Sequence, residues 1–223
     1  HWGLNRYLQM RIRRGVEAAF CQKTFLGNAS IQFIKQQLII HDLQVANPEG
    51  FTDQDFLHLD QCTLDIQPAS LLRNTVNIPE ITIDGLKIVM EQNIVLNNVQ
   101  EILTNIQEQN RISNPERGTL LAVGTVRLTH VTVVLRSQSL PGVKSKVSTV
   151  VLPELVLDLK NAQGISGRSL ITMHELTLQI LGRLAQEAAE SKQVDGTWRL
   201  LLRPIASTLQ APANASETQG RSH

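Results

Sequence analysis

Cysteine is scarce in this sequence: Cys21 and Cys62 are the two cysteines among 223 residues. A structural zinc site needs four ligands, often supplied by Cys-x-x-Cys pairs, and neither cysteine belongs to such a pair. Both one disulfide in an oxidising compartment and two buried free thiols are compatible with this spacing. The cysteines therefore argue against a zinc domain and leave the redox state open.

Long hydrophobic runs are absent as well. A transmembrane helix needs about 20 consecutive, mostly apolar residues, and the sequence contains no such run. The sequence starts at His1, without an initiator methionine, in residues that already follow a helical pattern. We therefore expect a membrane anchor, if the protein has one, to lie upstream of His1.

No charge of one sign dominates, since 21 Lys and Arg residues face 20 Asp and Glu residues. Proteins that bind nucleic acid usually present a strongly basic face, so we expect no nucleic-acid partner. The clearest local bias lies in residues 1–26, where Glu17 is the one acidic residue. The basic residues of that segment are Arg6, Arg11, Arg13, Arg14 and Lys23.

Catalytic and metal-binding motifs are also missing. His174 and Glu175 begin a metalloprotease pattern, but Leu178 occupies the position of the second histidine. Residues 164–168 lack the second glycine of a nucleophile elbow. The six histidines fall in separate predicted elements. We therefore expect no enzyme activity, no catalytic residue, no metal site and no cofactor.

An amphipathic helix is predicted from about residue 4 to residue 22. Its apolar stripe consists of residues spaced by four, which are Leu4, Leu8, Ile12 and Val16. Arg6 and Arg13 lie on the opposite side. This pattern is typical of a helix with a solvated polar face, or of one that lies on a membrane or a partner. These residues are our candidates for a membrane or partner contact.

Between Ala29 and Met90 the apolar residues alternate with polar ones, which is typical of strands with one apolar face. Asn98 and Glu101 have the spacing of a helix start, and the polar residues 107–117 are expected to end this second helix. Further strand patterns lead to a third helix, which begins with a capping box at Thr172 and Glu175.

The pattern weakens after Gly196, where Trp198 and Leu200 to Leu202 are compatible with one more short element against the core. From about Pro204 onward we predict an extended or disordered tail. The predicted organisation is an N-terminal helix in residues 1–26, a sheet and helix domain in residues 27–195 and a C-terminal extension in residues 196–223.

One short pattern occurs twice, as NIPEITID in residues 77–84 and VLPELVLD in residues 151–158. The apolar positions change parity at the Pro-Glu pair, and proline donates no hydrogen bond to a strand ladder. We therefore predict a bulge or bend at Pro79 and at Pro153. Glu80 and Glu154 are then solvent-side residues of the bends rather than a general acid and base.

These observations predict an α+β fold. Its centre is a curled, mainly antiparallel and trough-like sheet, because parity changes without proline as well, at Thr129 and His130. Three amphipathic helices pack on the sheet or flank it. The apolar side of the trough must be covered by these helices or filled by an apolar ligand.

Residues 29–106 resemble the N-terminal part of AsmA-like bacterial envelope proteins. The resemblance is carried by LQVANPEGF at 43–51, IQPASLLRNTVNI at 66–78, ITIDG at 81–85, Glu91, Asn97 and the apolar residues of helix 102–106.

The matched motif Asn47-Pro48-Glu49-Gly50 is typical of a turn. Asn47 supplies a side-chain acceptor, Pro48 a fixed φ, and Gly50 a residue that tolerates positive φ. Phe51 is expected to fill the core beside the turn. The motif predicts a strand corner and requires no ligand.

The resemblance implies a small, single-domain and non-enzymatic envelope protein on the periplasmic side of the bacterial inner membrane. Members of the family typically have one N-terminal transmembrane helix and trough-like sheets linked to lipid handling. The expected partner is the membrane surface or a lipid. The alternative is a structural accessory subunit that docks on a larger membrane protein complex.

Overall fold

The computed structural model describes residues 2–67, 69–70, 73, 75–93, 97–112, 120–137, 146–159 and 169–210. In these residues the chain forms four helices and one sheet. The helices are α1 (Trp2–Phe20), α2 (Asn98–Ile112), α3 (Met173–Glu190) and α4 (Gly196–Gln210). The prediction of three helices was therefore wrong by one.

The sheet is mixed but mostly antiparallel, and its strands are β1 (Thr24–Gln32), β2 (Gln37–Ala46), β3 (Asp55–Asp65), β4 (Thr75–Gln92), β5 (Leu120–Thr129), β6 (Val131–Ser137), β7 (Lys146–Leu152), β8 (Leu155–Asp158) and β9 (Ser169–Ile171). Strands β1 to β4 form an antiparallel meander. The long β4 then pairs in parallel with β5 along its first half and with β6 along its second half.

The remaining pairings are antiparallel: β5 with β8 and β9, and β6 with β7. The parallel pairing follows from the connection, because α2 lies between β4 and β5 and returns the chain to the same end of the sheet. The sheet stays open, with β1 at one edge and β7 and β8 along the other.

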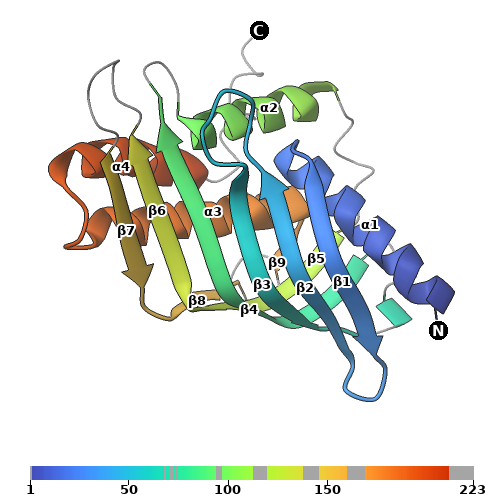
Figure 1. The fold of residues 1–223 in the computed structure, drawn as a ribbon. Coiled ribbons are helices and arrows are strands. Elements are labelled where there is room, and N and C mark those ends of the chain that lie inside the picture. Colours follow the sequence, from blue (N-terminus) through green and yellow to red (C-terminus); the bar gives the residue numbers. More distant parts are fainter. Residues whose placement is uncertain are drawn as a thin grey trace, which may run out of the picture.

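All four helices lie on one side of the sheet, and no described helix covers its other face (Figure 1). The apolar sides of the helices and of the strands form one buried cluster. Helix residues of this cluster include Phe20, Ile102, Leu184 and Trp198. Because the helices occupy the apolar face, the described residues do not show the open apolar trough that the sequence suggested.

The helix starts agree closely with the predicted capping patterns. Thr172 and Glu175 form a capping box in which each side chain accepts from the backbone N–H of the other residue. At α2 the cap is shifted by one residue from the prediction. The carbonyl of Asn97 accepts from Glu101 N at 3.1 Å, and its Oδ1 accepts from Val99 N at 2.8 Å. Asn97 is therefore the cap, and Asn98 is free for a different contact.

Two further segments differ from the predictions. Helix α2 continues to Ile112, into the range expected to be a loop. Helix α4 includes Pro204, in a range expected to be extended. The apolar side of α4, with Trp198, Leu202 and Ile205, is buried, and this burial outweighs the lost hydrogen bond at the proline. The predicted tail beyond Gln210 lies outside the described residues.

A crease runs straight across the sheet, at a row formed by Gly27, Asp42, Asp60, Gly85, His130 and Pro153. The register places these residues opposite one another: for example, the pairs His41–Gln61 and Leu43–Leu59 flank Asp42 and Asp60. The buried residues change parity at the row, as from Leu38 and Ile40 to Leu43 and Val45. In Figure 1 the sheet therefore turns sharply between β6 and β5.

The backbone at the crease is unusual. Asp42, Gly85 and His130 have φ values of 53°, 68° and 51°. For a residue with a side chain this region costs roughly 1–2 kcal/mol. The Asp60 side chain lies directly over Gly85, so that a Cβ atom at residue 85 would lie 2.1 Å from Asp60 Oδ2. Glycine is therefore required there for two reasons, its φ and its lack of volume.

A second crease crosses the sheet at Pro79, which lies inside β4 opposite Gly124 of β5. A Cβ atom at residue 124 would lie 2.4 Å from the Pro79 carbonyl oxygen. The register is the same on both sides of these residues, with Ile78 opposite Val123 and Glu80 opposite Thr125. No residue is inserted, so Pro79 marks a bend and not a bulge. Pro153 likewise joins β7 to β8 without a change of register.

The first prediction concerns the crease glycine. We expect Gly85→Ala to lower the free energy of unfolding by about 2 kcal/mol, because alanine at this φ is strained and its Cβ displaces Asp60. Gly15→Ala on α1 is the control: beyond its chain neighbours and the adjacent backbone of its own helix, no atom lies within 4 Å of its added Cβ. This helical substitution should stabilise the protein by about 0.5–1 kcal/mol. Urea unfolding measures both, and equal effects would contradict the assignment.

Candidate functional site: a buried polar network and the charged outer face

The residues of the turn motif lie where four segments meet: the end of β2, the start of β3, the end of β4 and the start of α2. Asn47 N donates to the Gln54 carbonyl at 2.8 Å, and Asn47 Nδ2 donates to the Asp53 carbonyl at 3.0 Å. Gly50 has a φ of 93°, as the motif predicts. The turn therefore closes on itself through Asn47.

Phe51 does not fill the core as expected and is partly exposed. Phe56, on the adjacent β3, is fully buried and packs against Phe20 with ring centroids 6.1 Å apart. The aromatic residue that fills the core beside the turn is therefore Phe56. Its position on the buried side of β3 decides this, since Phe51 precedes the strand.

Glu91, near the end of β4, binds this turn through its side-chain carboxylate. Its side chain has an exposed fraction of 0%. Thr52 N donates to both carboxylate oxygens of Glu91, at 2.9 and 3.0 Å, and Asp53 N donates to one of them at 3.3 Å. Hydrogen bonds from backbone N–H groups offset the cost of burying a carboxylate.

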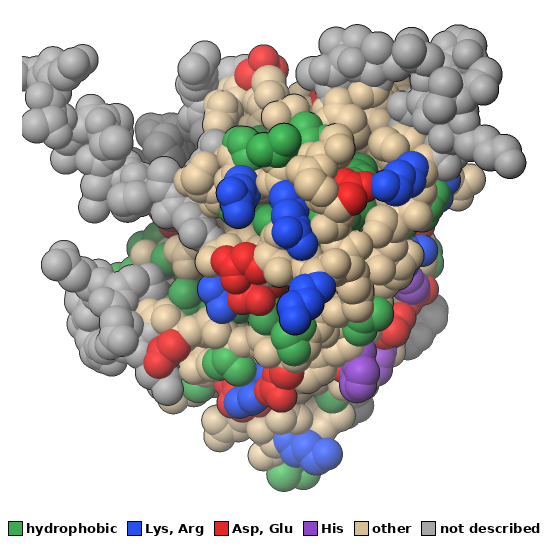
Figure 2. Space-filling view, turned by 90° about the vertical axis from the view of Figure 1, so that its left-hand side faces the viewer, with side chains coloured by type: hydrophobic (Ala, Val, Ile, Leu, Met, Phe, Trp, Pro, Cys, Tyr) green, Lys and Arg blue, Asp and Glu red, His purple; other side chains and the backbone are tan. Residues whose placement is uncertain are grey.

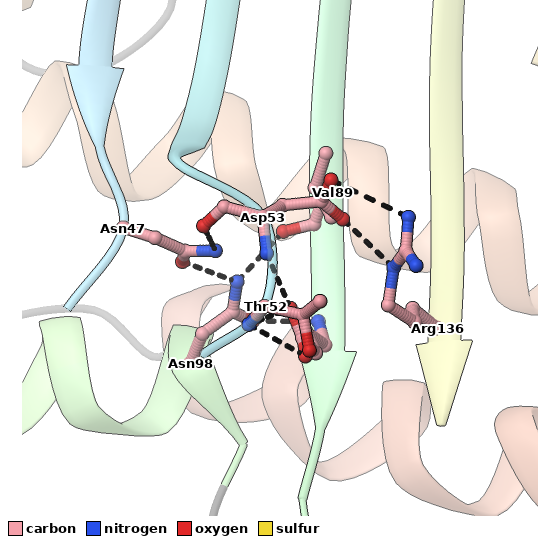
Figure 3. A network of polar contacts seen from close by, with 7 residues as sticks. Asn47, Thr52, Asp53, Val89, Asn98 and Arg136 are labelled. Carbon is pink, nitrogen blue, oxygen red and sulfur yellow. Dashed lines mark hydrogen bonds and ion pairs between the residues drawn. The ribbon is translucent and has the colours of Figure 1, made fainter. Parts of the chain in front are cut away.

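Asn98, the first residue of α2, joins the turn to β4 (Figure 3). Its Nδ2 donates to Asn47 Oδ1 and to the Val89 carbonyl, both at 2.8 Å, and its Oδ1 accepts from Glu91 N at 2.9 Å. One buried amide thus bonds with two residues of β4 and with the turn. We refer to Asn47, Thr52, Asp53, Glu91, Asn98 and Arg136 as the polar network.

Arg136 extends the polar network to β6. Its Nε lies 2.8 Å from Asp53 Oδ2, and its Nη2 donates to Asp53 Oδ1 at 3.3 Å. Both side chains are largely buried, so solvent screens this ion pair less than a surface pair. The polar network thereby ties together residues that are far apart in the sequence, through hydrogen bonds at the turn and an ion pair with β6.

The outer face of the sheet carries a row of acidic and histidine side chains along the crease. His58 Nε2 lies 3.1 Å from Asp42 Oδ1, and His130 Nδ1 lies 2.6 Å from Asp84 Oδ1. Hydrogen bonds from Thr129 and His130 lower the pKa of Asp84 below its usual 3.8. The same carboxylate raises the pKa of His130 above its usual 6.5.

The repeated Pro-Glu pattern also meets on the outer face, because Arg127 of β5 lies between the two glutamates. Arg127 Nε lies 3.3 Å from Glu80 Oε1, and its Nη1 forms an ion pair with Glu154. The carboxylates of Glu154 and Glu80 raise the pKa of Arg127. Each glutamate therefore serves as a counter-ion across the bend, which agrees with their predicted solvent-side position.

A hollow of about 350 Å³ lies beside the polar network on the outer face, lined by residues 52–55, His58, Lys87 and Val89. It is open and mostly polar, whereas small-molecule sites are usually enclosed and mostly apolar. Within the described ranges, no group of three or more His, Cys, Asp or Glu side chains is placed to hold a metal ion.

The candidate residues of α1 divide into two sets. Leu8 and Val16 are buried, and Ile12 packs against the core, so the apolar stripe contacts the protein itself. Arg6 and Arg13 are exposed, and Arg13 lies 3.7 Å from Glu17. The side chain of Leu4 lies outside the described residues. No described helix is long and apolar enough to cross a membrane.

The two cysteines are free thiols in the structure. Burial raises the pKa of Cys62 to about 12 and also raises the pKa of Cys21. A thiol reacts as its thiolate, so neither cysteine has the low pKa of a reactive site. The structure therefore shows the free-thiol alternative and places Cys62 in the core.

Sequence reasoning found the turn and Glu91 but not Asp53, Asn98 and Arg136 as their partners. The available signal was a charged residue at the end of an apolar strand, as in Met90-Glu91 and Leu135-Arg136. Such residues are rarely buried unless they are paired. Their partners came from segments whose proximity depends on the parallel pairing of β4 with β6.

Comparison with known proteins supports the resemblance seen in the sequence. The family model described as the AsmA family matches residues 16–168. The match includes the turn motif, both creases and the whole polar network. A search of curated proteins finds no match to the chain.

The second prediction tests the polar network. We expect Glu91→Ala to lower the free energy of unfolding by about 3 kcal/mol, because the N–H groups of Thr52 and Asp53 lose their buried acceptor. Glu108→Ala, on the exposed side of α2, should change it by less than about 0.5 kcal/mol. Urea unfolding compares them, and a Glu91 variant as stable as the Glu108 variant would refute the structural role.

The third prediction concerns His130 and Asp84. We expect Asp84→Asn to lower the pKa of His130 toward its usual 6.5, measured by NMR titration, because the carboxylate that favours the charged imidazole is gone. Asp195→Asn, which removes a carboxylate paired with Lys146 instead, should leave the His130 pKa unchanged.

The sign of the pH effect follows from the same pKa shifts. The contribution of His130 to stability is present below pH 6.5 and is lost as the pH rises through its raised pKa. The contribution of Asp84 is present above pH 3.8 and is lost as the pH falls through its lowered pKa. The pair therefore stabilises the protein most between these pH values. If Asp84→Asn leaves the free energy of unfolding unchanged throughout this pH range, the prediction is contradicted.

Proposed function

Because the chain belongs to the AsmA family, whose members are associated with the bacterial envelope, we propose that it is a non-enzymatic envelope domain at the periplasmic side of the inner membrane. In this proposal the domain is a rigid docking unit, whose surfaces contact the membrane or other envelope proteins.

The main observation behind this proposal is that the helices cover the apolar face of the sheet. Strand residues such as Ile88, Val133 and Leu135 are fully buried beneath the helices. An acyl chain would have to displace α3 or α4 and expose their buried side chains, among them Leu184 and Leu202. Each such side chain costs roughly 1.5–3 kcal/mol to expose. This cost favours a filled scaffold over a lipid-carrying trough.

The structural role of the residues that carry the family resemblance supports the same function. Asn47, Gly50 and Glu91, all in the segment that resembles AsmA proteins, hold the turn, the sheet and α2 together. None of the three needs a ligand to complete these bonds. A motif of this kind preserves the shape of a domain, and shape is what a docking unit requires.

The mixture of side chains on the surface is consistent with docking to other molecules. Figure 2 shows Lys and Arg, acidic and hydrophobic side chains interspersed over the side of the molecule that includes α4 and β7. The hydrophobic side chains form small separate groups there. Large apolar patches usually mark extensive interfaces, so we propose that the contacts of this side are mostly polar and that association with lipid takes place at the membrane surface.

The fourth prediction is tested by native mass spectrometry of the protein extracted from its own membranes in mild detergent. We expect the mass of the polypeptide without a stoichiometric lipid, alone or with protein partners in a fixed ratio. A retained lipid of defined mass, present in every molecule, would overturn the filled scaffold and favour a lipid-binding trough.

Placement on the periplasmic side is tested separately by labelling. Leu200 on α4 has an exposed fraction of 73%, so Leu200→Cys presents a thiol to solvent. A membrane-impermeant maleimide should label this variant in intact spheroplasts. The buried Cys62 is the internal control, since it should react only after unfolding. Labelling of residue 200 only after lysis would contradict the periplasmic placement.

A further inference from the structure

The turn between β1 and β2 exposes two large hydrophobic side chains at its tip. Ile34 has an exposed fraction of 100%, and Phe33 has one of 53%. The turn projects beyond the rest of the sheet as the lowest part of the molecule in Figure 1. In Figure 2 hydrophobic side chains and a Lys or Arg side chain lie together at this lowest point. We refer to residues 33–36 as the hairpin tip.

The hairpin tip is held in place by hydrogen bonds. Gln36 N donates to the Phe33 carbonyl at 3.3 Å, and Ile66 N donates to the Gln36 carbonyl at 2.8 Å. Gln37 Nε2 donates to Asp65 Oδ1 at 3.0 Å. The tip is thereby tied to the end of β3. Exposed Phe33 and Ile34 are thus presented by a braced loop, which needs little additional ordering when it binds.

Positive charge accompanies these apolar side chains. Lys35 lies between Ile34 and Gln36 in the turn and is exposed. Helix α1 begins at the same end of the molecule as the tip, and its Arg6 is exposed (Figure 1). The combination of aromatic, aliphatic and basic side chains matches the interface of an anionic bilayer.

We infer that the hairpin tip is a membrane contact, in which Phe33 and Ile34 enter the interface of an anionic lipid bilayer while Lys35 faces the headgroup phosphates. This deepens the proposed function, because it names the surface that the envelope domain contacts. Two apolar side chains are few for a stable protein interface, which buries about 800 Å² on each partner. A bilayer requires no matching pocket and accepts a small protruding tip.

Phe25 offers a closely matched control. It lies on β1, the strand that leads into the tip, but near the opposite end of that strand, and its exposed fraction of 55% is almost that of Phe33. Replacement of either phenylalanine by serine removes a similar exposed apolar surface. The two variants therefore differ mainly in the place from which this surface is removed.

The fifth prediction is a vesicle-binding experiment with the full chain. Co-sedimentation with vesicles of phosphatidylethanolamine and phosphatidylglycerol should show a partition coefficient about tenfold lower for Phe33→Ser than for the unaltered protein, and lower still for Phe33→Ser with Ile34→Ser. Phe25→Ser should bind like the unaltered protein. Vesicles of phosphatidylcholine alone should bind the unaltered protein more weakly, because they offer Lys35 no net negative charge.

A fluorescence measurement locates the contact directly. Tryptophan in Ile34→Trp should shift its emission to the blue when anionic vesicles are added, and brominated lipids should quench it. Phe25→Trp should show neither change. Thermal unfolding of each variant in the absence of vesicles verifies that its fold is intact.

The inference is overturned if the unaltered protein does not bind anionic vesicles, if the Phe33 and Ile34 variant binds as well as the unaltered protein, or if Phe25→Ser weakens binding equally. It is also overturned if Ile34→Trp stays unquenched. These outcomes are distinguishable from failure of the proposed function, because the labelling of Leu200→Cys reports the cellular side independently of the tip.

Discussion

The fold depends on one constraint, the alignment of the crease positions across the sheet. When the buried residues of a strand change from even to odd positions, the second half of the strand would normally turn its apolar side to solvent. Here neighbouring strands change parity at the same place, so each strand pair from β1 to β7 keeps the same register on both sides of the crease. The apolar side chains thus remain on the helix side while the sheet changes direction.

The crease also explains where polar residues are found. At the row itself each strand needs a residue that adopts an unusual φ or makes room for its neighbour, and Asp42, Gly85 and His130 meet this need. Their side chains, or those of their neighbours, point away from the core and form the charged pairs of the outer face. The charged row is therefore first a consequence of curvature. The titration of His130 and Asp84 changes stability modestly, because solvent reaches both side chains.

Local patterns in the sequence predicted much of this architecture. The changes of parity at Pro79 and at His130, the capping box of α3 and the turn at Asn47 are all visible within short stretches. The alignment of the creases is not visible in such short stretches, because it depends on the pairing of distant strands. The parallel pairing of β4 with β5 and β6 depends on how α2 returns the chain. For α4 the sequence suggested only a short element at residues 198–202, because Pro204 and the polar residues after it disfavour a longer helix locally.

The constant register also limits how this sequence can vary in length. An insertion or deletion inside β2, β3 or β4 would move one crease residue out of line with its neighbours and turn half of that strand inside out. Insertions are compatible with the sheet between strands, as pairs that extend two adjacent strands together, or near a strand end away from the crease, where the pairing of β2 with β3 already shifts register between Val45 and Ala46. Relatives of this chain should therefore differ from it by longer or shorter connections and by whole added strands at the edge of β7 and β8, while the distance from each strand end to its crease stays fixed.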